Sequence, residues 1–146
     1  MPPLAEIASA PIDTAALLEQ VAAPGNGATV LFTGTVRNSN RGRSVDYLEY
    51  QLYEKMAGHE LGRIVAAAEK RWPAVAVAAV HRVGRLEVGE VSVAVAAGSP
   101  HRAEAFEVCR YVVEELKSRL PVWKQEGYTG GSREWVPGVS PATTAP

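Results

Sequence analysis

One segment of this sequence, from Pro100 to Arg119, carries an apolar stripe at helical spacing, with acidic residues largely on the opposite side. Pro121 ends the segment, because the residue before a proline is pushed out of the helical region. The stripe therefore predicts a long amphipathic helix that has to bury one face against another element. Its apolar members are Ala105, Phe106, Cys109, Val112, Val113, Leu116 and Leu120.

Two further helices are expected earlier in the chain. A short one follows the N-cap candidate Asp13 and ends at the Pro-Gly-Asn-Gly sequence of residues 24–27. Between residues 56 and 71 apolar residues again recur at helical spacing, and Pro73 prevents much continuation.

Several stretches rich in Val, Leu, Phe and Thr are typical of strands. Residues 28–36 predict a buried strand, and the alternation in residues 45–53 suits a strand with both faces partly covered. The other candidates are residues 75–83, residues 91–97, and a hairpin with arms 122–126 and 133–136. Because strands and helices alternate without a regular βαβ series, the sequence predicts an α+β fold.

Composition removes several classes of protein. The 146 residues suffice for one domain, and 47% apolar residues argue against disorder. A net charge of −1 lacks the overall positive field of a nucleic-acid-binding protein. Cys109 is the single cysteine, so the chain can form no internal disulfide and no thiolate zinc site. A reducing compartment fits this composition.

The N-terminal residues have neither the positive charges nor the apolar core of a secretory signal. The apolar run of residues 74–80 is too short to span a membrane. We therefore expect a cytoplasmic protein with no membrane partner.

The polar loop after the first predicted strand contains Arg37, Arg41 and Arg43, and no Asp or Glu occurs between residues 20 and 45. Such a loop on a rigid element is suited to binding an anion. The alternative interpretation is three solvated surface arginines.

The start of the long helix breaks a rule of helix stability. With Ser99 as N-cap and Pro100 as first residue, His101 and Arg102 fall in the first turn, where the helix dipole disfavours cations. A phosphate or carboxylate bound there would explain them. The alternative is that both side chains point outward into solvent.

Lys117 flanks the apolar stripe of the long helix, so its amine is expected to be partly desolvated. Burial and neighbouring cations such as Arg37 and Lys124 would lower its pKa and give a neutral amine for proton transfer or attack. Docking of the helix against the strand with Lys124 would bring both amines to one pocket. The alternative is a lysine that extends from the helix end into solvent.

Other candidates are weaker. Cys109 lies on the apolar stripe and is interpreted as a small core residue rather than a nucleophile. The three histidines lack the spacing of metal ligands, and no nucleotide-binding fingerprint occurs, so we expect no metal and no cofactor.

Four segments in this order resemble the catalytic large subunit of molybdopterin synthase. They are residues 32–38 (Phe-Thr-Gly-Thr-Val-Arg-Asn), 81–86 (His-Arg-Val-Gly-Arg-Leu), 100–102 (Pro-His-Arg) and 116–126 (Leu-Lys-Ser-Arg-Leu-Pro-Val-Trp-Lys-Gln-Glu). The similarity extends from about Ala28 to Trp135, with Glu134 inserted into the family's closing Arg-Trp-Val. The resemblance implies a single α/β-hammerhead-like domain over residues 1–136 with a small β-rich subdomain, and a flexible tail over residues 137–146.

The resemblance also implies a reaction. The family converts cyclic pyranopterin monophosphate into molybdopterin by installing two dithiolene sulfurs. Each sulfur arrives as a thiocarboxylate on the C-terminal Gly-Gly of a small ubiquitin-like carrier subunit. Two large subunits form a central homodimer with a small subunit at each end, which gives a heterotetramer.

Carried over by residue, the resemblance implies that Lys117 is the leading catalytic amine, as general acid/base or through a covalent adduct. Lys124 supports it and polarises the thiocarboxylate carbonyl. Arg37 anchors the carrier terminus or the substrate, while His101 and Arg102 hold the substrate's anionic part. The pocket is completed by the backbone around Thr35 and Val36 and by Gln125 and Glu126.

We expect Lys117, Lys124, Arg37 and His101 to line one pocket, near a dimer interface from which the other chain can contribute residues. Two alternatives remain on sequence alone. One is a non-catalytic dimeric scaffold for a Gly-Gly-tailed partner, which needs the arginines but not Lys117. The other is a module that binds a phosphorylated metabolite.

Overall fold

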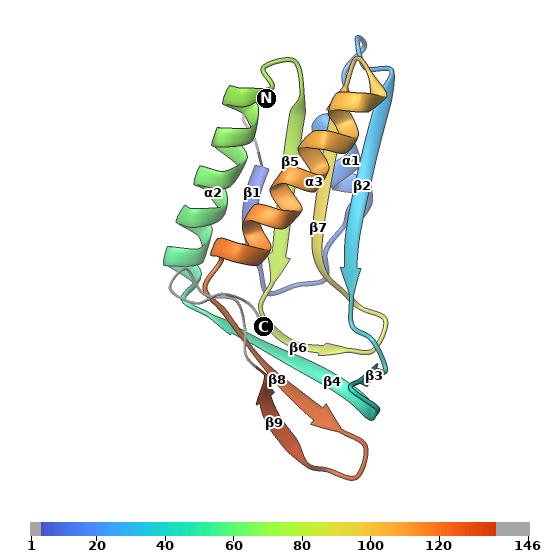
Figure 1. The fold of residues 1–146 in the computed structure, drawn as a ribbon, viewed down its shortest axis with the longest axis vertical. Coiled ribbons are helices and arrows are strands. Elements are labelled where there is room, and N and C mark those ends of the chain that lie inside the picture. The colour runs from blue at the N-terminus through green and yellow to red at the C-terminus, as the bar shows by residue number, and fades with distance from the viewer. Residues whose placement is uncertain (1–3, 137–146) are drawn as a thin grey trace.

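Two β-sheets and three helices make up residues 4–136, the part of the chain that the computed structural model describes (Figure 1). The expected tail, residues 137–146, lies outside the described residues. In chain order the elements are β1 (Leu4–Ala8), α1 (Thr14–Val21), β2 (Ala28–Thr35), β3 (Ser39–Asn40), β4 (Arg43–Leu52), α2 (Glu54–Arg71), β5 (Ala76–Arg82), β6 (Gly84–Glu87), β7 (Val91–Ser99), α3 (Arg102–Arg119), β8 (Val122–Tyr128) and β9 (Arg133–Val136).

The larger layer is a four-stranded sheet in the order β1-β5-β7-β2, in which β1 is parallel to β5 and the other pairs are antiparallel. Its central strands alternate between two cores. Val77 and Val95 face α2 and α3, whereas Ala78 and Ala96 face α1. Helices therefore cover both faces of this sheet, which explains why β5 and β7 are apolar almost throughout.

The second layer is a five-stranded sheet in the order β3-β4-β8-β9, with β6 also paired to β4. In Figure 1 it lies below the end of α3, from which the chain enters β8. Its own small core contains Val45, Leu48, Tyr50, Leu86 and Tyr128. The α+β class and the additional β-rich part predicted from the sequence are both confirmed.

Three local expectations were wrong. The edge strand β2 is half-buried rather than buried, because Val30 and Phe32 pack on the core under α3 while the alternate residues on its other face are exposed. Phe106 is 62% exposed, and Val108 takes its place in the core, because the buried stripe is rotated slightly around α3. The helix α3 begins at Arg102 with His101 as N-cap, since Ser99 is still paired in β7 and its hydroxyl accepts a hydrogen bond from the His101 amide.

The N-cap Asp13 is confirmed, with its carboxylate accepting from the Ala16 amide at 3.1 Å. The hairpin is also confirmed, with β8 extended to Tyr128 and Gly130 and Gly131 at positive φ in its loop. Among residues 4–136, no helix has the length and apolarity that crossing a membrane requires.

Candidate active site

A cavity of about 430 Å³ lies where the C-terminal end of α3 meets the two sheets. The residues around it come from both sheets, from α3 and from the segment of residues 37–43, which we call the arginine loop. They are Gly34, Thr35, Arg37, Ser39, Asn40, Arg41, Leu48, Tyr50, Ser92, Lys117, Lys124, Glu126 and Val136.

The register of β4 and β8 decides which strand residues reach the cavity. Lys124 lies directly opposite Tyr50, and Glu126 lies directly opposite Leu48. Paired residues share one face of an antiparallel sheet, and alternate residues face the other way. Gln125 therefore projects from the opposite face of β8, away from the cavity that Lys124 and Glu126 line.

Among the described residues that line the cavity, four side chains are cationic and one is a carboxylate. The cations are Arg37, Arg41, Lys117 and Lys124, and none of them forms an ion pair within residues 4–136. Unpaired cations repel one another, so this arrangement is stabilised when an anion enters. Of the two interpretations of the arginine loop, the structure favours the anion site for Arg37 and Arg41.

The two lysines differ in environment. Lys124 is half-buried on β8, and burial is the main cause that lowers its pKa. The charges of Lys117 and Arg37 lower this pKa further, while Glu126 acts in the opposite direction. Lys117 itself is exposed in the last turn of α3. The lysine that is partly buried is therefore Lys124, and the expectation that Lys117 is partly buried was wrong, because Lys117 reaches the cavity from an exposed position at the helix end.

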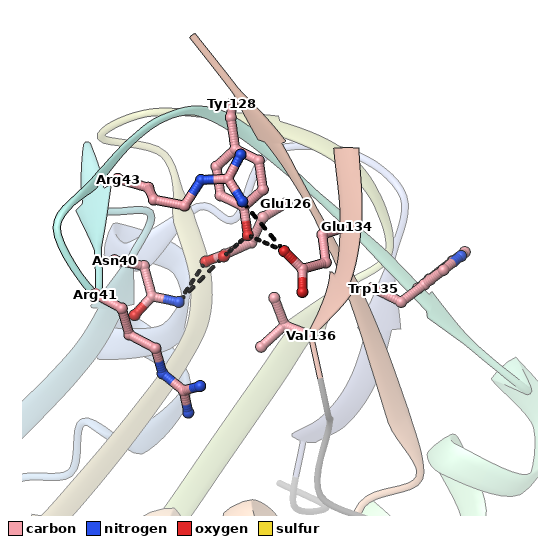
Figure 2. A pocket seen from close by; sticks show the side chains of 8 residues that line it. All are labelled: Asn40, Arg41, Arg43, Glu126, Tyr128, Glu134, Trp135 and Val136. Atoms are coloured by element: carbon pink, nitrogen blue, oxygen red, sulfur yellow. Dashed lines mark hydrogen bonds and ion pairs between the residues drawn. The ribbon is translucent and has the colours of Figure 1, made fainter. Parts of the chain in front are cut away.

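Glu126 is held on one side of the cavity by neutral donors, as Figure 2 shows for a smaller adjoining pocket of about 100 Å³. The Asn40 amide donates to both carboxylate oxygens, at 3.1 and 2.9 Å, and the Tyr128 hydroxyl donates to one of them at 2.8 Å. Burial and the neighbouring carboxylates raise the pKa of Tyr128 to about 12, which keeps its hydroxyl protonated. The carboxylate is thus satisfied without either lysine.

The same network ties the hairpin to the arginine loop. Arg43 lies over the Tyr128 ring, with its guanidinium carbon 3.5 Å from the ring centroid, and forms an ion pair with Glu134 at 3.2 Å (Figure 2). Arg43 is therefore a structural arginine, whereas Arg41 points away from this network.

The other predicted site residues do not all reach the cavity. Thr35 lines it, but Val36 is buried, and its amide and carbonyl are already bonded to Glu90 and Gly89. His101 and Arg102 are exposed at the opposite end of α3 from Lys117. A rise of 1.5 Å per residue separates them from Lys117 by roughly 24 Å. The expectation that one chain brings His101 to the lysines was therefore wrong.

Sequence reasoning missed several residues of the cavity and its adjoining pocket, among them Asn40, Tyr50, Ser92, Tyr128 and Glu134. The period of two along β8 joins Lys124, Glu126 and Tyr128 on one face and was available from the sequence. The partners Asn40, Tyr50 and Ser92 come from segments whose pairing only the fold defines.

The described residues offer neither a metal site nor an exposed thiol. Within residues 4–136 no group of three His, Cys, Asp or Glu side chains could hold a metal ion. Cys109 is buried, its thiol lies 3.7 Å from the Val95 carbonyl, and burial raises its pKa. This agrees with a core role for the cysteine.

Comparison with known proteins shows the family of this chain. The profile of the MoaE protein family matches residues 7–119. A molybdopterin synthase catalytic subunit from Nostoc sp. is 50% identical over 112 residues, which cover 76% of this chain and 68% of the relative. One from Halalkalibacterium halodurans is 40% identical over 126 residues, covering 86% and 80%.

Solved structures share the fold. Molybdopterin synthase from Staphylococcus aureus superposes with a TM-score of 0.85 at 36% identity, covering 90% of this chain and 96% of that one. A complex of subunits 1 and 2 of molybdopterin-converting factor from Helicobacter pylori has the same fold, with a TM-score of 0.75 at 23% identity over 92% and 91% of the chains. The chain therefore belongs to the MoaE protein family, the family of molybdopterin synthase catalytic subunits in molybdenum cofactor biosynthesis.

Proposed function

We propose that this chain transfers sulfur from the C-terminal thiocarboxylate of a small ubiquitin-like carrier subunit to cyclic pyranopterin monophosphate, forming the dithiolene of molybdopterin. The observation that carries the proposal is the convergence of Arg37, Arg41, Lys117 and Lys124 on one cavity. A phosphorylated pterin and a thiocarboxylate are both anions, and guanidinium and ammonium groups bind such ligands with charge-assisted hydrogen bonds.

The difference in burial between Lys124 and Lys117 supports a division of roles between them. Burial lowers the pKa of Lys124, which favours the neutral amine that proton transfer or nucleophilic attack needs. Lys117 reaches the same cavity from the exposed end of α3. There its side chain polarises the carbonyl of the thiocarboxylate or anchors an anion. The resemblance implied that Lys117 is the leading amine and that Lys124 supports it. Both lysines are therefore proposed to take part in the reaction.

The carrier subunit is proposed as the sulfur source because no described cysteine reaches the cavity. The Helicobacter pylori structure that shares this fold is a complex of two subunits. We propose that the Gly-Gly tail enters beside Arg37 and the arginine loop.

A second copy of the chain is proposed to complete the site. His101 and Arg102 stand free at the far end of α3, where they cannot serve the cavity of their own chain. In a homodimer with two-fold symmetry, each chain would deliver these residues to the other chain's cavity. With a carrier subunit on each chain, the assembly is a heterotetramer.

The deciding experiment mixes the protein with thiocarboxylated carrier subunit and the pterin precursor and measures dithiolene formation. Lys117→Ala and Lys124→Ala are each expected to lower the rate at least a hundredfold while carrier binding is retained. Lys70→Ala is the matched control, since Lys70 is also exposed in the last turn of a helix, α2, but far from the cavity residues.

The same experiment separates the alternatives. A non-catalytic scaffold would bind the carrier subunit but form no dithiolene with the wild-type chain. A module that binds a phosphorylated metabolite would bind the pterin but would not bind the carrier subunit. The half-buried Lys124 favours the enzyme, because neither alternative needs an amine with a lowered pKa.

A further inference from the structure

The two cavity lysines belong to different layers of the fold. Lys117 is on α3, which packs against β7 and β2 of the four-stranded sheet. Lys124 is on β8 of the five-stranded sheet. The distance between the two amines therefore depends on how the sheets are fixed to each other.

Tyr50 makes one of the contacts between these layers, and it lines the same cavity as the lysines. It is on β4 of the five-stranded sheet, opposite Lys124, and is 8% exposed. Its ring meets the His81 ring edge-on with centroids 5.3 Å apart, and the Ser92 side chain lies near its hydroxyl. His81 and Ser92 lie on β5 and β7 of the four-stranded sheet.

Both partners of Tyr50 are themselves fixed. The buried His81 ring donates from Nδ1 to the Arg82 carbonyl at 2.7 Å, and Ser92 donates to the Gly34 carbonyl at 3.2 Å. A buried tyrosine packed against two such anchored side chains cannot shift without breaking these packed contacts.

We infer that Tyr50 is a positioning residue for the reaction: it pins the sheet that carries Lys124 to the sheet on which the Lys117 helix packs, and so holds the two amines in one cavity. The inference rests on the proposed function. Burial raises the pKa of Tyr50, so its hydroxyl stays neutral and serves as a structural contact.

The charged and titratable groups that face Lys124 come from five places in the fold. They are Lys117 from α3, Arg37 from the loop after β2, Glu126 from β8 itself, and His81 and Tyr50 beneath the cavity. Loosening the Tyr50 contact would admit water and move Lys117 and Arg37 away from Lys124. Each of these changes raises the pKa of Lys124 towards its ordinary value.

The test compares Tyr50→Leu, which loses the ring contact and the hydroxyl, with Tyr50→Phe, which keeps the ring. The pKa of Lys124 is measured by NMR of ¹³C-labelled lysine side chains in the free protein, with assignment by Lys124→Arg. In Tyr50→Leu we expect this pKa to rise and kcat for dithiolene formation to fall roughly tenfold to a hundredfold, with KM changed less. Tyr50→Phe should lie between this variant and the wild type.

Leu48→Ala is the matched control. Leu48 is on the same face of the same strand, buried, and also lines the cavity, but it lies opposite Glu126. It should destabilise the protein without moving the pKa of Lys124. An unchanged Lys124 pKa in Tyr50→Leu, or an equal change in Leu48→Ala, would overturn the inference. Because the NMR measurement needs no substrate, it decides this point even if the wild-type chain makes no dithiolene, which would instead refute the proposed function.

Discussion

Asn40 donates two hydrogen bonds from its side-chain amide to the carboxylate of Glu126, across 86 positions of sequence. The contact holds the arginine loop against β8, next to Lys124. The neutral Asn40 amide and the Tyr128 hydroxyl satisfy the buried carboxylate without an ion pair to the surrounding cations, while its charge still acts on Lys124. The loop can therefore present Arg37 and Arg41 to a ligand while Glu126 stays satisfied.

Replacing Asn40 by aspartate is expected to disrupt this contact. Asn40→Asp places a second carboxylate against Glu126, so two hydrogen bonds give way to like-charge repulsion. We expect a loss of about 1–3 kcal/mol in the free energy of unfolding, measured in urea, together with slower dithiolene formation. Asn38→Asp adds the same charge to an exposed residue of the same loop and should change stability by less than about 0.5 kcal/mol. Equal losses in both variants would argue against the contact.

Lys124 is expected to cost stability near neutral pH. Burial lowers its pKa in the folded chain, whereas the unfolded chain keeps the ordinary value of about 10.4. Between these two values the unfolded state binds more protons, so the free energy of unfolding rises with pH in that window. Below the folded-state pKa the full destabilisation is present.

Lys124→Met should therefore be more stable than the wild type at pH 7, and the difference should shrink as the pH approaches 10.4. Urea unfolding at pH 7, 9 and 10 measures this difference. Lys117→Met, at an exposed position, should stay within about 0.5 kcal/mol of the wild type. A Lys124→Met protein that is less stable at every pH would contradict the burial argument.

His81 is expected to make the fold sensitive to acid. Burial lowers its pKa from 6.5 to about 4, and the charges of Lys117 and Lys124 act in the same direction. Between pH 6.5 and 4 the unfolded chain binds a proton that the folded chain does not, so stability falls as the pH drops, by up to about 1.4 kcal/mol per pH unit.

His81→Asn keeps a donor for the Arg82 carbonyl but does not titrate, so it should remove this share of the pH dependence. The variant is expected to start from a lower stability at pH 7, because the Tyr50 ring contact is lost. His59→Asn is the control, since His59 is exposed on α2. Identical slopes for wild type and His81→Asn between pH 6.5 and 4.5 would show that another group dominates.

Mixed dimers can test whether the second copy supplies His101. If it does, a dimer of one Lys117→Ala chain and one His101→Ala chain has one intact cavity, because the remaining Lys117 and the remaining His101 meet there. After equimolar mixing, half the dimers are mixed, so about a quarter of the wild-type activity should return. Lys117→Ala mixed with Lys124→Ala should recover nothing, because both lysines belong to the same cavity of one chain. Recovery in that control would mean that the lysines come from different chains.

Local sequence patterns predicted much of the fold. The stripe on residues 100–119, the cap at Asp13 and the hairpin after Pro121 depend on near neighbours, and the structure contains all three. The errors, such as the exposed Phe106 and the open side of β2, occur where burial depends on which element lies alongside.

The candidate site divides in the same way. Sequence by itself determined that cations gather in the loop after β2 and around the end of α3, because residue type and position along the chain are local properties. Only the tertiary structure decided that Lys124 rather than Lys117 is desolvated, that Glu126 is held by Asn40, and that His101 lies at the wrong end of α3. Desolvation and hydrogen-bond partners depend on what packs against a side chain, and for this cavity those neighbours come from two sheets that meet only in the folded chain.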